Sequence, residues 1–516
     1  MPGCPTLGRG HLEGNALAPG GFLWYYTRMK NRRRIGLLIA ILIVAGLREN
    51  GISARSSALT YRDYAAQAVQ ALLQNFYDGR GRWRACVGVC RASNSDWGAD
   101  SLTYTLFFHW KTTRDASVVP YFKTLEQTAP MYGGPCIGSA CKSWSDVPEW
   151  DSVAASRDYE ITADALALTK AKAAYERVEG SDAYALGACP KIRYQIPFGG
   201  GGGLKTLETD ANAIKAGLLL YRYTKDSTYL TTAIARYAAV RRYFLDPQVA
   251  LYTVYVFDNG KTCAQLPHRF FSSINGLMMT NSFTLAQLTG NATYLHDAQA
   301  TAAAVRWYLS DQDGIHEDLQ AENDIVEPLL ESMYDLAVAG DAAAASWVMN
   351  NAAAAVSARA QNGAYGRLFG GPAPSAPITA WQANGGLSVE MAAAALNPNG
   401  FPTSTKHWQH AKFVSDSITK LPATLSFSGS AIALIGTLGE VCCQPGHARV
   451  FIDGTETFDN TGIWQNKSSS GHTFPDAVLF AWRWPSSGTH TLQFYPGINN
   501  PKEGGSFLHL QGYLLP

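Results

Sequence analysis

The chain has 516 residues, of which 47% are hydrophobic and 16% are charged, so it can bury the cores of one large and one smaller domain. Its formal net charge is +1 and its pI is near 7.6. This balance provides no basic face for nucleic acid, so we expect no nucleic-acid partner and favour a neutral substrate.

An apolar run at residues 35–47 follows a basic segment that begins at Met29. The run is too short to cross a bilayer comfortably, but it fits the hydrophobic region of a secretory signal. We therefore predict that residues 1–28 are a mis-assigned upstream start, that residues 29–58 are a signal peptide, and that the protein is secreted. The alternative is a membrane anchor formed by residues 35–47, in which case the uncleaved segment holds the protein at a membrane.

The nine cysteines support export independently. Eight of them follow the predicted leader as three close pairs and two single residues: Cys86 and Cys90, Cys136 and Cys141, Cys442 and Cys443, and the separate Cys189 and Cys263. Local disulfides in an oxidising compartment are the interpretation we favour, with a bridge from Cys189 to Cys263 as the long one. A zinc site is the alternative, but no pair has the Cys-x-x-Cys spacing and no histidine cluster accompanies them, so we expect no metal and no cofactor.

Five helix-like stretches between residues 110 and 341 end with the same pattern: an aromatic or apolar residue, two spacers, Thr or Ala, one spacer, and Asp or Asn. The Asx residues are Asp115, Asp164, Asp226, Asn291 and Asp341, which are 49 to 65 residues apart. An Asx residue at this place is typical of an N-cap, so each is predicted to start the returning helix of a hairpin. Hairpins of varying length favour a closed ring of about six over an open solenoid. The concave face of such a ring is where chemistry is expected.

Residues 144–152 combine three carboxylates with two tryptophans at the predicted start of a helix. Pro148 suits a first helical turn, and acidic residues there interact favourably with the helix dipole, so Asp146 as a plain N-cap is one interpretation. The other is that inner-helix starts line a cleft, because glycoside hydrolysis needs two carboxylates that flank the bond and aromatic rings that stack on sugars. The candidate catalytic residues are Asp146, Glu149 and Asp151, and the candidate substrate contacts here are Trp144 and Trp150.

This segment resembles the family-76 glycoside hydrolases, endo-α-1,6-mannanases with an (α/α)6 toroid fold. In that family two adjacent aspartates precede a tryptophan-rich helix ending Ala-Tyr-Glu-Leu-Thr, much like Asp158-Tyr-Glu-Ile-Thr162 here. The resemblance places Asp146 on the first aspartate, the nucleophile, and Val147 on the second, the acid/base. Because valine transfers no proton, either Glu149 or Asp151 takes over, the activity differs, or the site is inactive. The resemblance continues through residues 212–229 and 281–295 and implies a toroid over residues 59–400.

Three further segments carry polar groups for the same cleft. One lies before the helix of the third repeat, where the acidic residue is either a substrate contact or an N-cap. Another approximates the family's Asn-Gln-Gly motif, and its histidine is alternatively structural. The third is the densest acidic run of the chain, which is alternatively the start of an amphipathic helix. The candidate substrate-binding residues in these segments are Asp210, then His268, Arg269 and Asn275, and finally Glu322 and Asp324.

After residues 397–402 the pattern changes to alternating and β-branched stretches separated by Gly, Pro and Asn. It predicts a small all-β domain over residues 405–516, a sandwich of the jelly-roll type. Pieces such as Ile452-Asp-Gly resemble the galactose-binding-like jelly rolls of many carbohydrate-active enzymes, which implies carbohydrate binding. Trp464, Trp482 and Trp484 are its candidate ligand-facing groups, with burial in the core as the alternative.

Together these features predict a monomeric, secreted glycoside hydrolase that acts on a polysaccharide by a retaining two-carboxylate mechanism. The resemblance implies an α-mannan as that polysaccharide. Two alternatives stay open. A non-catalytic glycan-binding protein on a glycosidase scaffold is consistent with Val147, and a polysaccharide lyase on the same fold would use a base such as His268.

Overall fold

The computed structural model describes residues 58–88, 97–128, 145–179, 187–193, 203–247, 249–265, 270–310, 314–316, 325–360, 362–366, 369, 378–403, 412–418, 422–438, 448–456, 474–496 and 510–515. The predicted leader before Ala58 lies outside these ranges. None of the helices within them is long and apolar enough to cross a membrane. Leu59–Pro516 form one compact unit.

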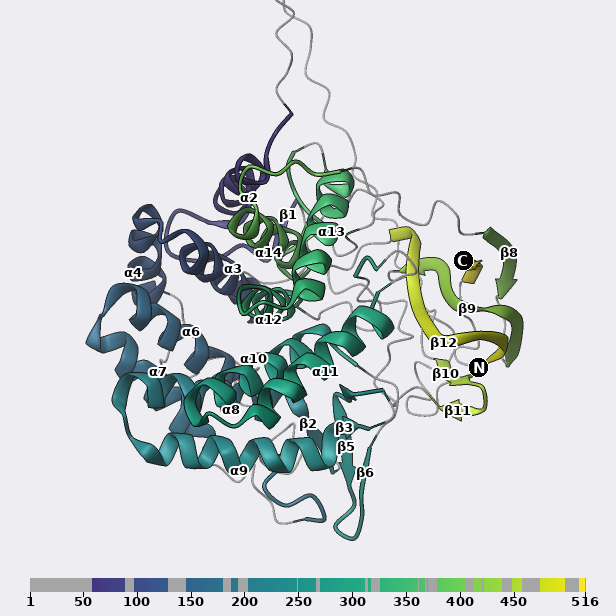
Figure 1. The fold of residues 1–516 in the computed structure, drawn as a ribbon, viewed down its shortest axis with the longest axis horizontal. Coiled ribbons are helices and arrows are strands. Elements are labelled where there is room, and N and C mark those ends of the chain that lie inside the picture. The colour runs from purple at the N-terminus through teal and green to yellow at the C-terminus, as the bar shows by residue number, and fades with distance from the viewer. Residues whose placement is uncertain are drawn as a thin grey trace, which may run out of the picture. The chain divides into compact units, whose positions relative to one another are not determined.

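The described part of this unit contains twelve α-helices in an inner and an outer layer. The inner helices are α3 (Trp97–Thr113), α6 (Asp146–Thr162), α8 (Leu207–Thr224), α10 (Ser272–Thr289), α12 (Glu327–Val338) and α14 (Ala380–Leu396). The outer helices are α2 (Tyr61–Phe76), α4 (Val119–Thr128), α7 (Ala165–Glu179), α9 (Ser227–Phe244), α11 (Ala292–Tyr308) and α13 (Ala342–Ala358). Each inner helix contacts the next and α14 contacts α3, so the inner ring is closed, with the outer helices at its periphery (Figure 1). The predicted mainly helical ring is confirmed.

The repeated Asx residues lie in the short turns that lead from an inner helix to the next outer helix. Each side chain accepts a hydrogen bond from the backbone N–H two residues later, as Asp226 Oδ1 does from Thr228 at 2.9 Å. In four of the five, the preceding threonine hydroxyl accepts a hydrogen bond from the Asx N–H at 3.2–3.3 Å. The predicted N-caps are therefore confirmed. Because every such turn follows the C-terminus of an inner helix, the short turns share one end of the ring and the longer connections share the other.

The two ends of the ring meet at a seam between the start of α2 and the residues after α14. The backbone N–H groups of Tyr61 and Arg62 donate hydrogen bonds to the carbonyls of Gly400 (2.9 Å) and Pro398 (3.2 Å). A capping box at Thr60 fixes the start of α2 at the same place. The first and last turns of the helical region are therefore joined directly.

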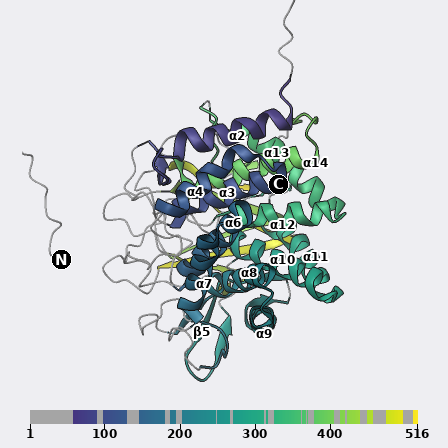
Figure 2. The same cartoon turned by 90° about the vertical axis from the view of Figure 1, so that its left-hand side faces the viewer.

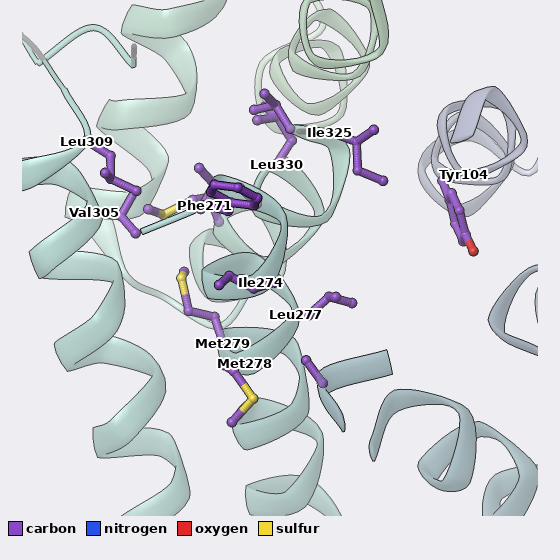
Figure 3. Close-up of a cluster of buried hydrophobic side chains, with 14 of the residues drawn as sticks. Tyr104, Phe271, Ile274, Leu277, Met278, Met279, Val305, Leu309, Ile325 and Leu330 are labelled. Atoms are coloured by element: carbon purple, nitrogen blue, oxygen red, sulfur yellow. The ribbon is translucent and has the colours of Figure 1, made fainter. Parts of the chain in front are cut away.

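The core lies between neighbouring helices of the two layers, which Figure 2 shows from the side. Ile274 and Leu277 of α10, Val305 of α11 and Leu330 of α12 are all almost fully buried, and Figure 3 shows them in one cluster. Burying each such side chain stabilises the fold by about 1.5–3 kcal/mol. Beside them, a Cβ added at Gly276 would lie 2.3 Å from the backbone nitrogen of Leu329, so α10 and α12 approach more closely there than any side chain permits.

Short strands lie within the longer connections. They are β1 (Cys86–Val87) paired with β7 (Ile378–Thr379), the sheet β2 (Leu204–Thr206), β5 (Tyr255–Asp258) and β6 (Cys263–Gln265), and β3 (Leu245–Asp246) paired with β4 (Leu251–Tyr252). The predicted disulfide between Cys189 and Cys263 is confirmed, with a Cα separation of 5.3 Å. It fixes the segment before α8 to this sheet. Cys86 is also disulfide-bonded.

The described residues from Lys412 to Leu515 lie in strands and tight turns, which agrees with the predicted β region; the sandwich and its carbohydrate binding stay predictions. One antiparallel sheet has the order β11-β10-β12-β9-β13-β8, formed by β8 (Lys412–Ile418), β9 (Ala423–Leu438), β10 (Ala448–Ile452), β11 (Thr455–Glu456), β12 (Phe474–Pro496) and β13 (Leu510–Leu515). Trp484 is buried, its indole N–H donates to Asp453 Oδ2 at 3.1 Å, and its ring stacks on His490 at 4.0 Å. Trp484 therefore belongs to the core, which was the alternative, and Trp464 lies outside the described residues.

Candidate active site

A buried ion cluster identifies which side of each inner helix faces the ring interior. Glu331 of α12 accepts hydrogen bonds from Arg157 of α6 at 2.5 Å and from Lys215 of α8 at 2.6 Å, both on Oε2, and from Lys111 of α3 at 3.2 Å on Oε1. Burial opposes ionisation of Glu331, but the three cations outweigh it and hold the pKa of this carboxyl well below its usual range. Arg157 and Lys215 therefore mark the ring-facing sides of α6 and α8.

Asp146 lies on the same side of α6 as Arg157. Eleven residues separate them, and 3.6 residues per turn place the two side chains within about 20° of each other around the helix. Asp146 is the first residue of α6, is 5% exposed, and its Oδ1 accepts no hydrogen bond. Ser145 occupies the N-cap position, so the structure does not support Asp146 as a plain N-cap. A buried carboxylate oxygen without a partner is instead available to a ligand.

The surroundings of Asp146 shift the pKa of its carboxyl. Burial raises its pKa to about 6, while the backbone amides of Asp146 and Val147 and the side chain of Trp150 favour the charged form. The carboxyl is therefore ionised at neutral pH but poised close to it, as is common for carboxyls that act in catalysis.

Two packed aromatic residues, Trp150 and Tyr104, lie on the ring-facing side near Asp146. Trp150 follows one turn later on the same side and is 5% exposed. Tyr104 of α3 donates a hydrogen bond to the Trp150 carbonyl at 2.5 Å, and the two rings meet edge to face at 5.5 Å. The guanidinium of Arg157 lies 4.6 Å above the Tyr104 ring. Trp150 therefore lies one turn from Asp146, and its role as a substrate contact stays a prediction.

Glu149 lies on a different side of α6, facing the outer layer. Arg193 donates to its Oε1 at 2.9 Å, and both residues are fully buried. Glu179 and Asp210 share the same cluster through Arg193 and Arg236, with Arg236 Nε 3.3 Å from Asp210 Oδ1. Three carboxyls meet two guanidiniums, and burial raises the pKa of Glu149 to about 8, so one proton neutralises the cluster. The structure thus brings Glu149 and Asp210 into one cluster with Arg193 and Arg236, on the side of α6 that faces the outer layer.

Of the remaining predicted residues, Asp151 and Asn275 are described by the structure and the others are not. Asp151 is buried and lies about 140° around α6 from Asp146. Asn275 is fully engaged with the backbone: its Oδ1 accepts from Tyr252 at 2.9 Å, and its Nδ2 donates to the carbonyls of Tyr252 and Phe271. It therefore anchors β4 to α10. The other predicted residues lie outside the described ranges, and these are Trp144, His268, Arg269, Glu322 and Asp324.

Two carboxyls on the ring-facing sides, Glu208 and Glu327, are not among the site residues predicted from the sequence. Glu208 precedes Lys215 by two helical turns, within about 20° of it, and is partly exposed. Glu327 is the first residue of α12, fully buried, 3.7 Å from Arg157 Nη1, and burial raises its pKa to about 7 against the effect of Arg157. The signal that could have found Glu208 is its seven-residue spacing from Lys215, which places both on one side of α8.

A cavity of about 70 Å³ lies within the ring toward the short turns. Its lining comes from the middle and C-terminal parts of five inner helices and includes Lys111, Lys215, Arg222, Asn281 and Asp335. Asp146 is instead at an N-terminus, so this cavity is separate from the candidate catalytic carboxylate.

Residues 60–397 match glycosyl hydrolase family 76. The alpha-1,6-mannanase of Salegentibacter sp. HEL1_6 is 19% identical, with 65% of this chain and 100% of that chain covered and a TM-score of 0.57. An inactive variant of that enzyme, with two adjacent aspartates replaced, has been solved with alpha-1,6-mannotetrose. It is 19% identical to this chain, with 66% of this chain and 100% of that chain covered and a TM-score of 0.58. A family-76 alpha-mannanase of Bacteroides thetaiotaomicron is 18% identical, covering 66% of this chain and 97% of that one, with a TM-score of 0.54. No curated protein sequence is significantly similar to the chain.

Proposed function

Because the chain belongs to glycosyl hydrolase family 76, and is therefore a glycoside hydrolase, we propose that it cleaves the α-1,6-linked backbone of a mannan. One observation carries this proposal: Asp146 at the ring-facing start of α6 is buried, and its Oδ1 has no hydrogen-bond partner. The resemblance of residues 146–162 places the first aspartate of the family there. The similar Salegentibacter enzyme, solved with an alpha-1,6-mannan oligosaccharide, supports the choice of linkage.

We propose a retaining mechanism with Asp146 as the nucleophile. Its pKa of about 6 leaves it ionised at neutral pH, and its free Oδ1 can attack the anomeric carbon. A second carboxyl must protonate the departing oxygen and then activate a water molecule that releases the sugar. Trp150 and Tyr104 supply apolar surface beside the nucleophile, where a sugar face can pack.

Val147 leaves the second carboxyl to be found elsewhere, since its side chain transfers no proton. Glu149 is held by Arg193 between the two helical layers, and Asp151 is turned about 140° from Asp146. For this reason we propose that neither takes the acid/base role, and that another inner helix provides it.

Secretion is part of the proposal. The disulfide between Cys189 and Cys263 supports an oxidising compartment. Sequencing the N-terminus of the exported protein would test the predicted cleavage after the apolar run at residues 35–47; an intact leader on a membrane-bound form would favour the anchor instead.

The proposed activity is tested with purified protein and α-1,6-mannan, by counting new reducing ends. We expect hydrolysis by the wild type, and a loss of several orders of magnitude for Asp146→Asn. Glu176→Gln is the matched control, because Glu176 is an exposed residue of the outer helix α7. Products that absorb in the ultraviolet would indicate a lyase. Tight binding of mannan without new reducing ends would indicate a glycan-binding protein.

A further inference from the structure

The proposed mechanism needs a proton donor on the ring-facing side, at the same end of the ring as Asp146. Among the residues whose side chains the structure describes, two other acidic groups near the N-termini of inner helices lie on ring-facing sides. These are Glu208 of α8 and Glu327 of α12, and they differ in depth and exposure.

The register of α8 places Glu208. Lys215 reaches the ring interior, because its Nζ is 2.6 Å from Glu331 Oε2, and Arg222 lines the interior cavity seven residues later. Counting two turns back from Lys215 keeps the same side of the helix and arrives at Glu208. By contrast Asp210, two residues further along, points to Arg236 of the outer helix α9, as the same register requires.

Glu208 and Asp146 lie at the same end of the ring on neighbouring helices. Arg157 and Lys215 meet on one oxygen of Glu331, so they give α6 and α8 a common reference level. Asp146 is eleven residues above this level and Glu208 is seven, an axial difference of about 6 Å at 1.5 Å per residue. Since packed helices lie about 8–10 Å apart and both side chains are directed toward the ring axis, the two carboxyls converge from neighbouring helices, as the pair of a retaining glycosidase must.

Exposure distinguishes Glu208 from Glu327. Glu208 is partly exposed, so an incoming sugar and a water molecule can reach its carboxyl. Glu327 is fully buried and lies 3.7 Å from Arg157 Nη1, so it belongs to the buried ion cluster around Arg157. An acid/base catalyst must protonate the leaving oxygen and later take a proton from a water molecule that enters from solvent. The partly exposed Glu208 meets this need, and the fully buried Glu327 does not.

We propose that Glu208 is the acid/base catalyst that replaces the aspartate missing at Val147; this inference rests on the proposed function. In the first step the Asp146 carboxylate forms a bond to the anomeric carbon while the glycosidic bond breaks, and the Glu208 carboxyl gives its proton to the departing oxygen. In the second, the Glu208 carboxylate takes a proton from water, whose oxygen attacks the anomeric carbon and releases Asp146. Atoms and charge balance without a cofactor.

Glu208→Gln keeps the size of the side chain and removes its proton. On α-1,6-mannan we expect turnover to fall by about 10²–10⁴-fold. On a 2,4-dinitrophenyl α-1,6-mannobioside, whose leaving group needs no protonation, we expect a burst of dinitrophenol close to the wild-type rate. Sodium azide should then accelerate steady-state turnover and give a mannobiosyl azide, and the alkaline limb of the pH profile should disappear. Glu176→Gln should show none of these changes.

Two comparisons keep the outcome decisive. The melting temperature of Glu208→Gln shows whether the variant is folded, and Glu208→Asp should recover part of the activity on mannan. If Glu327→Gln shows the burst and azide rescue while Glu208→Gln behaves as wild type, Glu327 is the acid and our assignment is overturned. Wild-type protein that cleaves neither substrate would overturn the proposed function and this inference together. Active wild type with an unaffected Glu208→Gln overturns this inference alone.

Discussion

Replacing Asp146 by Asn should make the protein more stable while it makes the enzyme inactive. The carboxyl is 5% exposed and its pKa is raised from 3.8 to about 6, mainly by burial. A shift of about two pKa units corresponds to roughly 3 kcal/mol that the folded state loses by ionising Asp146. Asn keeps the shape and cannot ionise, so most of this loss is avoided. Its weaker interaction with the helix dipole costs about 0.5 kcal/mol, which leaves a net gain of about 2 kcal/mol.

The sign of the effect fixes its pH dependence. A raised pKa in the folded state means that the neutral carboxyl contributes stability below about pH 4, and that this contribution is lost as the pH rises through about 6. The difference between Asp146→Asn and wild type should therefore be near zero at pH 4 and reach its full size by pH 7.5. Urea unfolding of both proteins at these two pH values measures it.

The same residue governs the acidic limb of the activity profile. Because the nucleophile must be charged, kcat/KM of the wild type should fall below about pH 6. A capping residue would behave in the opposite way, since its loss destabilises a helix at neutral pH. An Asp146→Asn variant that unfolds more easily than wild type at pH 7.5, or a stability difference that does not change between pH 4 and 7.5, would refute the reasoning.

Three further changes test the framework around the site. Glu331→Gln leaves Arg157, Lys111 and Lys215 without their shared carboxylate and should cost about 3–5 kcal/mol in urea unfolding; a loss under about 1 kcal/mol would show that the cluster is not a stabilising centre. Cys189→Ser with Cys263→Ser opens a bridge of sequence separation 74 and should cost about 4 kcal/mol by the same measurement, whereas an unchanged unfolding midpoint would contradict this. A chain that ends at residue 404 should keep its helical circular dichroism and its turnover on soluble mannan, because α14 already closes the ring on α3 and α2. It should lose affinity for insoluble mannan. Unfolding of the truncated chain would place the domain boundary elsewhere.

The helical ring could be predicted because its signals are local. An Asx residue that caps the next helix acts over two or three residues, so the pattern at Asp226 and Asn291 is visible without knowing what the helices pack against. The disulfide between Cys189 and Cys263 could also be predicted from the sequence, since two single cysteines remain when the close pairs are set aside.

The site was harder to predict because its geometry is set by distant partners. Glu149 and Asp146 are three residues apart in one helical turn, yet Arg193, 44 residues later, draws Glu149 toward the outer layer. Asn275 fits a family motif in sequence but is saturated by the backbone of Tyr252 and Phe271. Only the ion cluster on Glu331 reveals which side of α6 and α8 faces inward, and it joins residues from four helices. Such an arrangement leaves no contiguous pattern in the chain.

The seam at Tyr61 and Gly400 gives the helical region the connectivity of a circle. Backbone hydrogen bonds hold its first and last turns together, so a short peptide could link them without moving a helix. Each Asx turn, such as the one at Asp341, is then an equivalent place to open the circle, because it lies at the end of the ring away from Asp146. The order in which the helices are synthesised is therefore separable from the order in which they pack, and circularly permuted chains can present the same active site.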